Sequence, residues 1–205
     1  KIEKFSPDII VVTCMFSQTH QALLDVIKVI RSKYSTPIAI GGVHVTGSMS
    51  EDKTREKFIE DIKGVNFIFL NESEVSFREF IKYINFKENQ QYLTQFIAID
   101  NNDHIKFEER LTPTGDDLNI NPNHKKMFTG QVATVGKIGG FFSLLPKQKK
   151  LSTILSNRGC RAQCTFCSVR NFNGVGVRRR TIDSVIEELK ILKFEPGIDH
   201  VMWLD

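Results

Sequence analysis

The sequence predicts an α/β protein, with a doubly wound parallel sheet first, then a connector with a β-hairpin, then one strand–helix–strand unit. Short apolar runs of strand length alternate with amphipathic helical stretches over the first 85 residues. The middle of the chain is rich in turn-forming residues. Near the end, two strand-like runs flank an amphipathic helix. We therefore predict three segments, residues 1–85, 86–150 and 151–205.

The first segment alternates three predicted strands with helices. Residues 8–13 form a continuous apolar run, as expected for a strand that is covered on both faces. Two further strands are predicted at residues 38–40 and 67–70. The apolar positions of the helices that follow the strands are Ala22, Leu23, Val26, Ile27 and Ile30, then Phe58, Ile59 and Ile62, then Phe77, Phe80, Ile81 and Ile84. This order is typical of Rossmann-like and flavodoxin-like sheets.

Glycines and polar residues follow each predicted strand of this segment. The carboxyl ends of parallel strands share one edge, and ligands bind beyond that edge in open α/β sheets. Two adjacent glycines also let the backbone approach a large planar ligand. The candidate ligand contacts are Ser17, Thr19, Gly41, Gly42, His44, Asn71 and Glu72. The alternatives are a scaffold of the same fold that binds nothing and, for His44 alone, an ordinary polar loop residue.

The connector contains one predicted hairpin. Residues 96–99 and 105–107 are β-prone, and the turn-forming run Asn101-Asn102-Asp103 separates them. A polar, turn-rich stretch follows at residues 112–123. The Gly-rich residues 136–140 lack the spacing and the terminal Lys-Ser/Thr of a phosphate-binding loop, so we interpret them as an ordinary loop.

The last segment predicts a strand, a cysteine-rich loop, a helix and a second strand. Residues 151–156 are β-prone and lead to Gly159, which permits a sharp turn. Residues 182–192 repeat apolar side chains at helical spacing, and Pro196-Gly197 ends the helix. Residues 200–204 are again strand-like. In such units the functional loop follows the carboxyl end of the first strand.

Three of the four cysteines lie in that loop. Cys160, Cys164 and Cys167 follow a C-x3-C-x2-C pattern. Three clustered thiolates can bind a 4Fe-4S cubane and leave one iron open for a substrate or cofactor. Structural zinc is an alternative, although it usually takes four ligands and no His follows at finger-like spacing. A disulfide is another, although it would leave one thiol over. Cys14 lies in an apolar run and is expected to be a small buried hydrophobe.

Composition and charge narrow the classes of partner. Hydrophobic residues make up 40% and charged residues 25% of the chain, and no apolar stretch approaches the ~18 residues of a transmembrane helix. We therefore expect a cytoplasmic protein without a membrane span. The net charge of +4 does not demand a nucleic-acid partner. The basic run Arg178-Arg179-Arg180 is interpreted either as a solvated face or as a contact for carboxylate or phosphate.

The cysteine-rich loop resembles the cluster loop of radical S-adenosylmethionine enzymes, whose motif is C-x3-C-x-aromatic-C. The resemblance implies that Cys160, Cys164 and Cys167 bind a 4Fe-4S cluster. It also implies that Phe166, in the aromatic position, packs near the adenine of S-adenosylmethionine, with ordinary core packing as the alternative. In that family the open iron chelates S-adenosylmethionine, and electron transfer cleaves it to a 5'-deoxyadenosyl radical. A flavodoxin or ferredoxin is the implied electron donor.

The first segment resembles the cobalamin-binding domain that precedes the catalytic barrel in a large branch of this family. The resemblance implies that the sheet edge binds cobalamin. The matching pieces, in order, are residues 7–12, Ser17-Gln18-Thr19, Gly41-Gly42-Val43-His44 and Asn71-Glu72-Ser73-Glu74. The last piece is usually Gly-Glu-Gly-Glu in the family, and here Asn71 and Ser73 replace both glycines. A D-x-H-x-x-G motif, which supplies a cobalt-ligating His in some cobalamin proteins, would fall before Lys1.

The same resemblance implies that residues 151–205 begin a partial (β/α) barrel. Such a barrel needs on the order of six βα units, so we expect a fragment, and the start at Lys1 suggests that the amino terminus is also incomplete. We expect an enzyme that methylates or rearranges a small-molecule substrate by radical chemistry. One alternative is a tRNA methylthiotransferase-like enzyme, disfavoured because only Cys14 lies in the first segment. The other is a non-catalytic module that carries a cluster or corrinoid.

Overall fold

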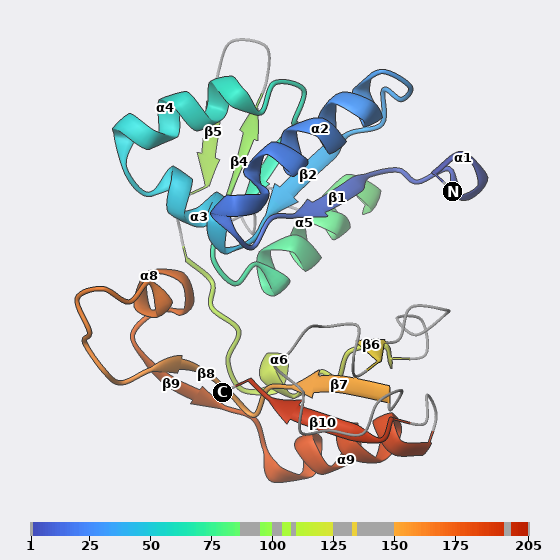
Figure 1. Ribbon diagram of the computed structural model, residues 1–205, viewed down its shortest axis with the longest axis vertical. Coiled ribbons are helices and arrows are strands. Elements are labelled where there is room, and N and C mark those ends of the chain that lie inside the picture. Colours follow the sequence, from blue (N-terminus) through green and yellow to red (C-terminus); the bar gives the residue numbers. More distant parts are fainter. Residues whose placement is uncertain are drawn as a thin grey trace. The chain divides into compact units, whose positions relative to one another are not determined.

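The chain folds into two compact units. The structure, a computed structural model, describes residues 2–86, 95–99, 104–107, 110–124, 133–134, 150–194 and 198–204. The first unit comprises Lys1–Pro113 and Gln163–Gly174, and the second comprises Thr114–Ala162 and Val175–Asp205. Figure 1 labels the elements of both units. The unit boundaries differ from the three predicted segments, because the predicted hairpin and part of the cysteine loop belong to the first unit.

The first unit is built on a mixed sheet of five strands in the order β1-β2-β3-β4-β5. The strands β1 (Ile10–Thr13), β2 (Ile38–Gly41) and β3 (Phe67–Phe69) are parallel, as predicted. The hairpin of β4 (Phe96–Ile99) and β5 (His104–Phe107) is also confirmed, but it pairs antiparallel with β3. The prediction of a wholly parallel sheet is therefore wrong at this side. The apolar run of β4 covers the edge of β3, which would otherwise expose unpaired backbone groups.

The helices of this unit occupy the connections between the strands. Apolar spacing locates α2 (His20–Arg31), α4 (Asp52–Asp61) and α5 (Glu74–Phe86) correctly. The sequence does not predict α3 (Val43–Met49), because it contains Gly47 and three β-branched residues, which are poor helix formers. The remaining helical elements are α1 (Ile2–Phe5), η1 (Ser17–Thr19) and α8 (Val169–Asn173).

The core of the first unit lies on both faces of the sheet, and successive strand residues alternate between the two faces. Ile38, Ile40 and Ile68 belong to the layer that α2, α3 and α4 cover. Ala39 and Phe69 belong to the other layer, which α5 covers. The second layer is aromatic, with the rings of Phe69 and Phe96 stacked at a centroid distance of 5.3 Å. Helices therefore cover both faces, and the carboxyl ends of the parallel strands stay available for loops.

The second unit contains the predicted strand–helix–strand unit. β7 (Lys150–Ile154) and β10 (His200–Trp203) are parallel neighbours, and α9 (Ile182–Phe194) precedes β10. β6 (Ala133–Thr134) pairs antiparallel with β7, and α6 (Asp116–Asn119) precedes it. A hairpin of β8 (Asn157–Cys160) and β9 (Gly176–Arg179) was not predicted, because we assigned residues 157–159 to a turn.

Several predicted features lie outside the described residues, namely Asn101-Asn102-Asp103, the Gly-rich residues 136–140 and Pro196-Gly197. Within the described part of the chain, no helix combines the length and the apolar character that a membrane crossing requires.

Candidate functional site

The candidate site of the first unit is the edge of the sheet at the carboxyl ends of its parallel strands. After β1 the chain carries Ser17 and Thr19 in η1, and after β2 it carries Gly42, with His44 following in the first turn of α3. The loop after β3 carries Asn71 and Glu72. Because β1, β2 and β3 are parallel, all three loops leave the sheet at the same edge. Hydrogen bonds join the segment after β1 to α3, and α3 to the loop after β3.

A chain of polar side chains begins at Ser17 and runs through two histidines. Ser17 Oγ lies 3.2 Å from His44 Nδ1, and His44 Nε2 lies 3.0 Å from His20 Nδ1. His20 Nε2 in turn lies 3.6 Å from a carboxylate oxygen of Asp61. The ring of Phe58 contacts both imidazoles, at centroid distances of 5.7 and 5.8 Å. These hydrogen-bonded side chains therefore link the segment after β1 to Asp61 at the end of α4, through His44 of α3 and His20 of α2.

Burial lowers the pKa of His44, and the charge of His20 lowers that pKa further. A neutral imidazole has one N–H donor and one acceptor nitrogen. The carboxylate of Asp61 favours a proton on Nε2 of His20, so Nδ1 of His20 accepts a hydrogen bond from Nε2–H of His44. His44 Nδ1 then accepts the hydroxyl proton of Ser17. In this arrangement Ser17 presents an oxygen acceptor to the sheet edge.

Gly42 is required by the packing of the loops themselves. Its φ is +112°, and an added Cβ would lie 2.4 Å from the carbonyl oxygen of Cys14. Both the conformation and the close approach exclude a larger side chain. An added Cβ at Gly41 would lie 3.3 Å from the carbonyl oxygen of Phe69. The two glycines thus let neighbouring backbone segments approach each other, and their contact with a ligand stays a prediction.

The hydroxyl of Thr19 is engaged within its own loop. It donates to the carbonyl of Phe16 at 2.7 Å and lies 3.4 Å from the thiol of Cys14. Cys14 is 2% exposed, as predicted for a small buried hydrophobe. Thr19 and Cys14 therefore shape the loop after β1 from inside.

In the loop after β3, Asn71 adopts a left-handed backbone conformation that usually favours glycine. Asn71 has a φ of +58°, in the left-handed region that Asn tolerates better than most residues. Its backbone N–H donates to the Thr46 hydroxyl at 2.8 Å. Glu72 is buried, and its carboxylate accepts a hydrogen bond from the side chain of Asn173. The structure thus turns Glu72 inward, while Asn71 lines a pocket.

That pocket, which we call the edge pocket, has a volume of about 470 Å3. Its size falls within the range of small-molecule sites. Four segments of the first unit line it. The lining residues are Val43, Thr46, Gly47, Met49 and Ser50, then Leu70 and Asn71, then Arg110, Ser168, Arg170, Asn171 and Phe172.

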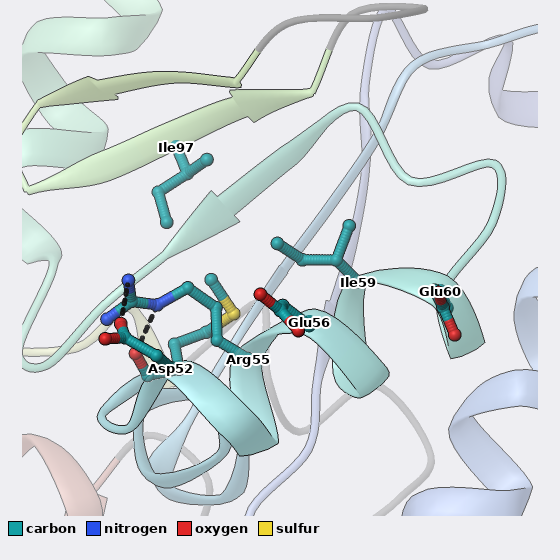
Figure 2. A pocket seen from close by; sticks show the side chains of 7 residues that line it. Asp52, Arg55, Glu56, Ile59, Glu60 and Ile97 are labelled. Atoms are coloured by element: carbon teal, nitrogen blue, oxygen red, sulfur yellow. Dashed lines mark hydrogen bonds and ion pairs between the residues drawn. The ribbon is translucent and has the colours of Figure 1, made fainter.

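A second pocket of similar volume lies against α4 and has a different character. Ile97 comes from the sheet, whereas the other labelled residues come from α4 (Figure 2). Arg55 forms an ion pair with Asp52 at 2.9 Å and donates to the carbonyl of Met49 at 3.0 Å. Among the described residues, Arg55 is the only basic residue that lines this second pocket, and Asp52 already pairs with it. None of the predicted site residues lines it.

The three cysteines of the loop are free thiols. Cys160 ends β8 in the second unit, whereas Cys164 and Cys167 belong to the first unit and are exposed. The N–H of Cys167 donates to the carbonyl of Cys164 at 3.2 Å, which closes a turn. Phe166 is 91% exposed, so its alternative reading as core is wrong. Within the described residues, no three His, Cys, Asp or Glu side chains are grouped to hold a metal ion, and the ligand set stays a prediction.

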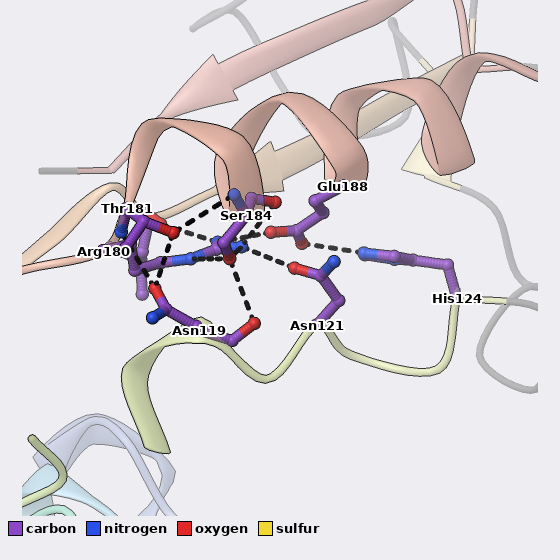
Figure 3. A network of polar contacts seen from close by, with 8 residues as sticks. Asn119, Asn121, His124, Arg180, Thr181, Ser184 and Glu188 are labelled. Atoms are coloured by element: carbon purple, nitrogen blue, oxygen red, sulfur yellow. Dashed lines mark hydrogen bonds and ion pairs between the residues drawn. The ribbon is translucent and has the colours of Figure 1, made fainter. Parts of the chain in front are cut away.

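The basic run has a structural role at Arg180. Its guanidinium pairs with Glu188 and contacts Asn121, and it donates to the carbonyl of Leu155 at 3.0 Å. His124 Nε2 lies 2.8 Å from the other oxygen of Glu188 (Figure 3). The side chains of His124 and Glu188 are each 3% exposed. Arg180 thus binds a carboxylate, as one interpretation expected, but that carboxylate is its own neighbour in the second unit.

Several polar residues of the site are not among the predicted candidates. His20 and Asp61 are two of them, although His20 directly follows Thr19 as the first residue of α2. Arg110, Arg170 and Asn173 come from distant segments, and no local pattern connects them with the sheet edge.

Comparisons with known proteins find similar proteins whose matches extend over nearly all of this chain. No protein-family model matches. The cytidylyl-2-hydroxyethylphosphonate methyltransferase of Streptomyces wedmorensis is 22% identical over 97% of this chain and 40% of that protein. An uncharacterised methyltransferase of Pyrococcus horikoshii is 25% identical over 100% of this chain and 40% of that protein. The chain therefore spans about 40% of the length of these relatives.

Two solved structures share the fold. The radical S-adenosylmethionine methyltransferase TsrM from Kitasatospora setae, with cobalamin and a 4Fe-4S cluster bound, matches 99% of this chain and 39% of its own, at 16% identity and a TM-score of 0.62. The cobalamin-dependent S-adenosylmethionine radical enzyme OxsB, with aqua-cobalamin and S-adenosylmethionine bound, matches 100% of this chain and 26% of its own, at 23% identity and a TM-score of 0.63.

Proposed function

We propose that this chain, which is related to the amino-terminal portion of the cobalamin-dependent radical S-adenosylmethionine methyltransferases, binds a 4Fe-4S cluster and cobalamin. Cys160, Cys164 and Cys167 are the proposed cluster ligands. The reaction is the reductive cleavage of S-adenosylmethionine, coupled to methyl transfer to a small molecule or to its radical rearrangement. The electron donor is a flavodoxin or a ferredoxin.

The observation that carries this proposal is the exposure of the loop's reactive and aromatic side chains. Cys164 and Cys167 are exposed free thiols on one closed turn, and Phe166 between them is 91% exposed. Packing within the described residues explains none of these side chains. A thiolate set of this kind suits iron-sulfur chemistry, because soft sulfur ligands select such clusters. The donor set therefore fits the proposed group.

Each loop residue has a proposed task. Bound to three thiolates, the cluster supplies an open iron and an electron for S-adenosylmethionine. Cys160, Cys164 and Cys167 hold it as thiolates, so binding releases their protons. Phe166 provides an apolar surface for the adenine ring and shields the site from water.

Cobalamin is proposed at the sheet edge, over the loops that carry Ser17, Gly42 and His44. Both ring nitrogens of His44 already have partners, Ser17 on Nδ1 and His20 on Nε2. Cobalt ligation by His44 would break one of these hydrogen bonds. We therefore propose that His44 orients Ser17 toward the corrinoid and does not ligate cobalt.

Anaerobic reconstitution with iron and sulfide tests the cluster. We expect about four iron atoms per chain and a broad absorbance near ~400 nm, as for a 4Fe-4S centre. Cys164→Ala should lose both signals. Cys14→Ala is the matched control, because Cys14 is buried directly after β1. This variant should keep the iron. Equal iron in the Cys164→Ala variant and the control would refute the ligand assignment.

Two further measurements separate the remaining possibilities. Under reduction, formation of 5'-deoxyadenosine from S-adenosylmethionine distinguishes an enzyme from a carrier, which would form none. Absorbance of the protein after incubation with hydroxocobalamin and gel filtration tests the corrinoid. Retained corrinoid bands support the sheet edge as its site, and their absence contradicts it.

A further inference from the structure

The edge pocket is a basic cavity. Arg110 and Arg170 line it, and no Asp or Glu is among its described lining residues. A cavity lined by charges of one sign concentrates ligands of the opposite sign. None of the three loop cysteines lines the pocket, although Ser168 directly follows Cys167. Ser17, Gly42 and His44, over which cobalamin is proposed, do not line it either.

The backbone holds the two arginines in different ways. Arg110 donates to the carbonyl of Asn171 at 3.2 Å and also to that of Phe172. These contacts hold the segment that carries Arg170 next to Arg110. The guanidinium of Arg170 itself has no hydrogen-bond or ion-pair partner in the part of the chain that the structure describes. It is partly buried, so its charge is only partly hydrated.

Neutral donors also line the pocket. Ser168 is the N-cap residue of α8, but its hydroxyl makes no capping hydrogen bond. The backbone N–H of Asn71 donates to the Thr46 hydroxyl, which fixes the position of Asn71. Its carboxamide can therefore donate to a ligand in the pocket. A hydroxyl, a carboxamide and a guanidinium are the groups that commonly surround a bound oxyanion.

We propose that the edge pocket binds an oxyanion, the phosphate, phosphonate or carboxylate group of a small molecule. Arg170 is the cationic contact, and Ser168 and Asn71 are the neutral donors. Arginine suits this task because its planar fork pairs with two oxygens of one anion. The site would select small molecules that carry such a group and would hold them in the edge pocket, between Asn71 and the segment of Ser168 and Arg170.

Titration of the purified protein with inorganic phosphate, followed by 31P NMR, tests the proposal. Arg170→Gln should weaken phosphate binding by roughly tenfold or more, because it removes a charge-assisted contact. Arg179→Gln is the control, since it removes the same charge from an exposed residue of β9 and should change the affinity by less than about twofold. Ser168→Ala removes a hydroxyl without a capping role and should weaken binding by about threefold.

Competition experiments identify the anion. Displacement of phosphate by methylphosphonate indicates a tetrahedral group, and displacement by acetate indicates a carboxylate. Either result supports the site if the Ser168→Ala variant shows weaker binding. The proposal is overturned if the wild-type protein shows no saturable phosphate binding, or if Arg170→Gln and Arg179→Gln bind phosphate equally well. Ser168→Ala keeps the backbone hydrogen bonds of Phe172 to Ser168 and of Gly174 to Arg170, so it remains a valid test if Arg170→Gln does not fold.

Discussion

His44 and His20 share a hydrogen bond, with Nε2 of His44 3.0 Å from Nδ1 of His20. Two imidazoles at this distance cannot both be protonated without strong repulsion. The pair joins the loops after β1 and β2 and orients the hydroxyl of Ser17. The pair therefore ties the position of the Ser17 hydroxyl to the packing of α2 against α3.

The pKa of His44 gives a prediction for acid conditions. Burial and the charge of His20 lower it from 6.5, so the unfolded chain takes up this proton first as the pH falls. The contribution of His44 to stability is therefore present above 6.5 and is lost as the pH falls toward the lowered folded value. NMR titration of the imidazole signals should find His44 below its ordinary pKa, and His20→Gln should raise it. A His44 pKa at or above 6.5 would contradict the arrangement.

Gly42→Ala should destabilise the first unit by about 2 kcal/mol or more, because a side chain is strained at this φ and its Cβ meets the carbonyl of Cys14. Gly47→Ala is the matched control. Gly47 lies in α3 with nothing near an added Cβ, so the change should stabilise the protein by roughly 0.5–1 kcal/mol. Urea unfolding measures both. Equal midpoints for the two variants would show that the close approach of Gly42 is not needed.

Glu188→Ala should destabilise the second unit by about 3–5 kcal/mol, because it leaves Arg180 and His124 buried without their carboxylate. The neighbouring Glu187 is exposed on the same helix, so Glu187→Ala should change stability by less than about 0.5 kcal/mol. Thermal unfolding compares the two variants, and a small effect of Glu188→Ala would mean that water replaces its contacts.

Asn71→Gly and Asn71→Ala separate the backbone role of this residue from its side chain. Both variants remove the carboxamide, but only Gly adopts the φ of +58° without strain. Asn71→Ala should therefore cost about 1 kcal/mol of stability relative to Asn71→Gly. Both should weaken phosphate binding equally if the carboxamide is a donor to the anion. Equal stability of the two variants would contradict the left-handed conformation.

Local sequence patterns predict most of the helices and strands, whereas the cluster chemistry of the cysteine loop stays a prediction. The strands near residues 10–13, 38–41 and 67–69 and the helices α2, α4, α5 and α9 follow from local apolar periodicity, which depends only on neighbouring residues. The sharing of one edge by the loops after β1, β2 and β3 follows from their parallel order. The buried state of Cys14 follows from its apolar neighbours.

Only the tertiary structure decided which distant residues meet. It paired β4 with β3, placed Gly42 against Cys14, and joined His44 to His20. It also brought Arg110 and Arg170 to one pocket. The physical reason is that pairing across a sheet, close backbone approach and charge clustering depend on separations in space, and residues 60 positions apart leave no periodic trace of such contacts.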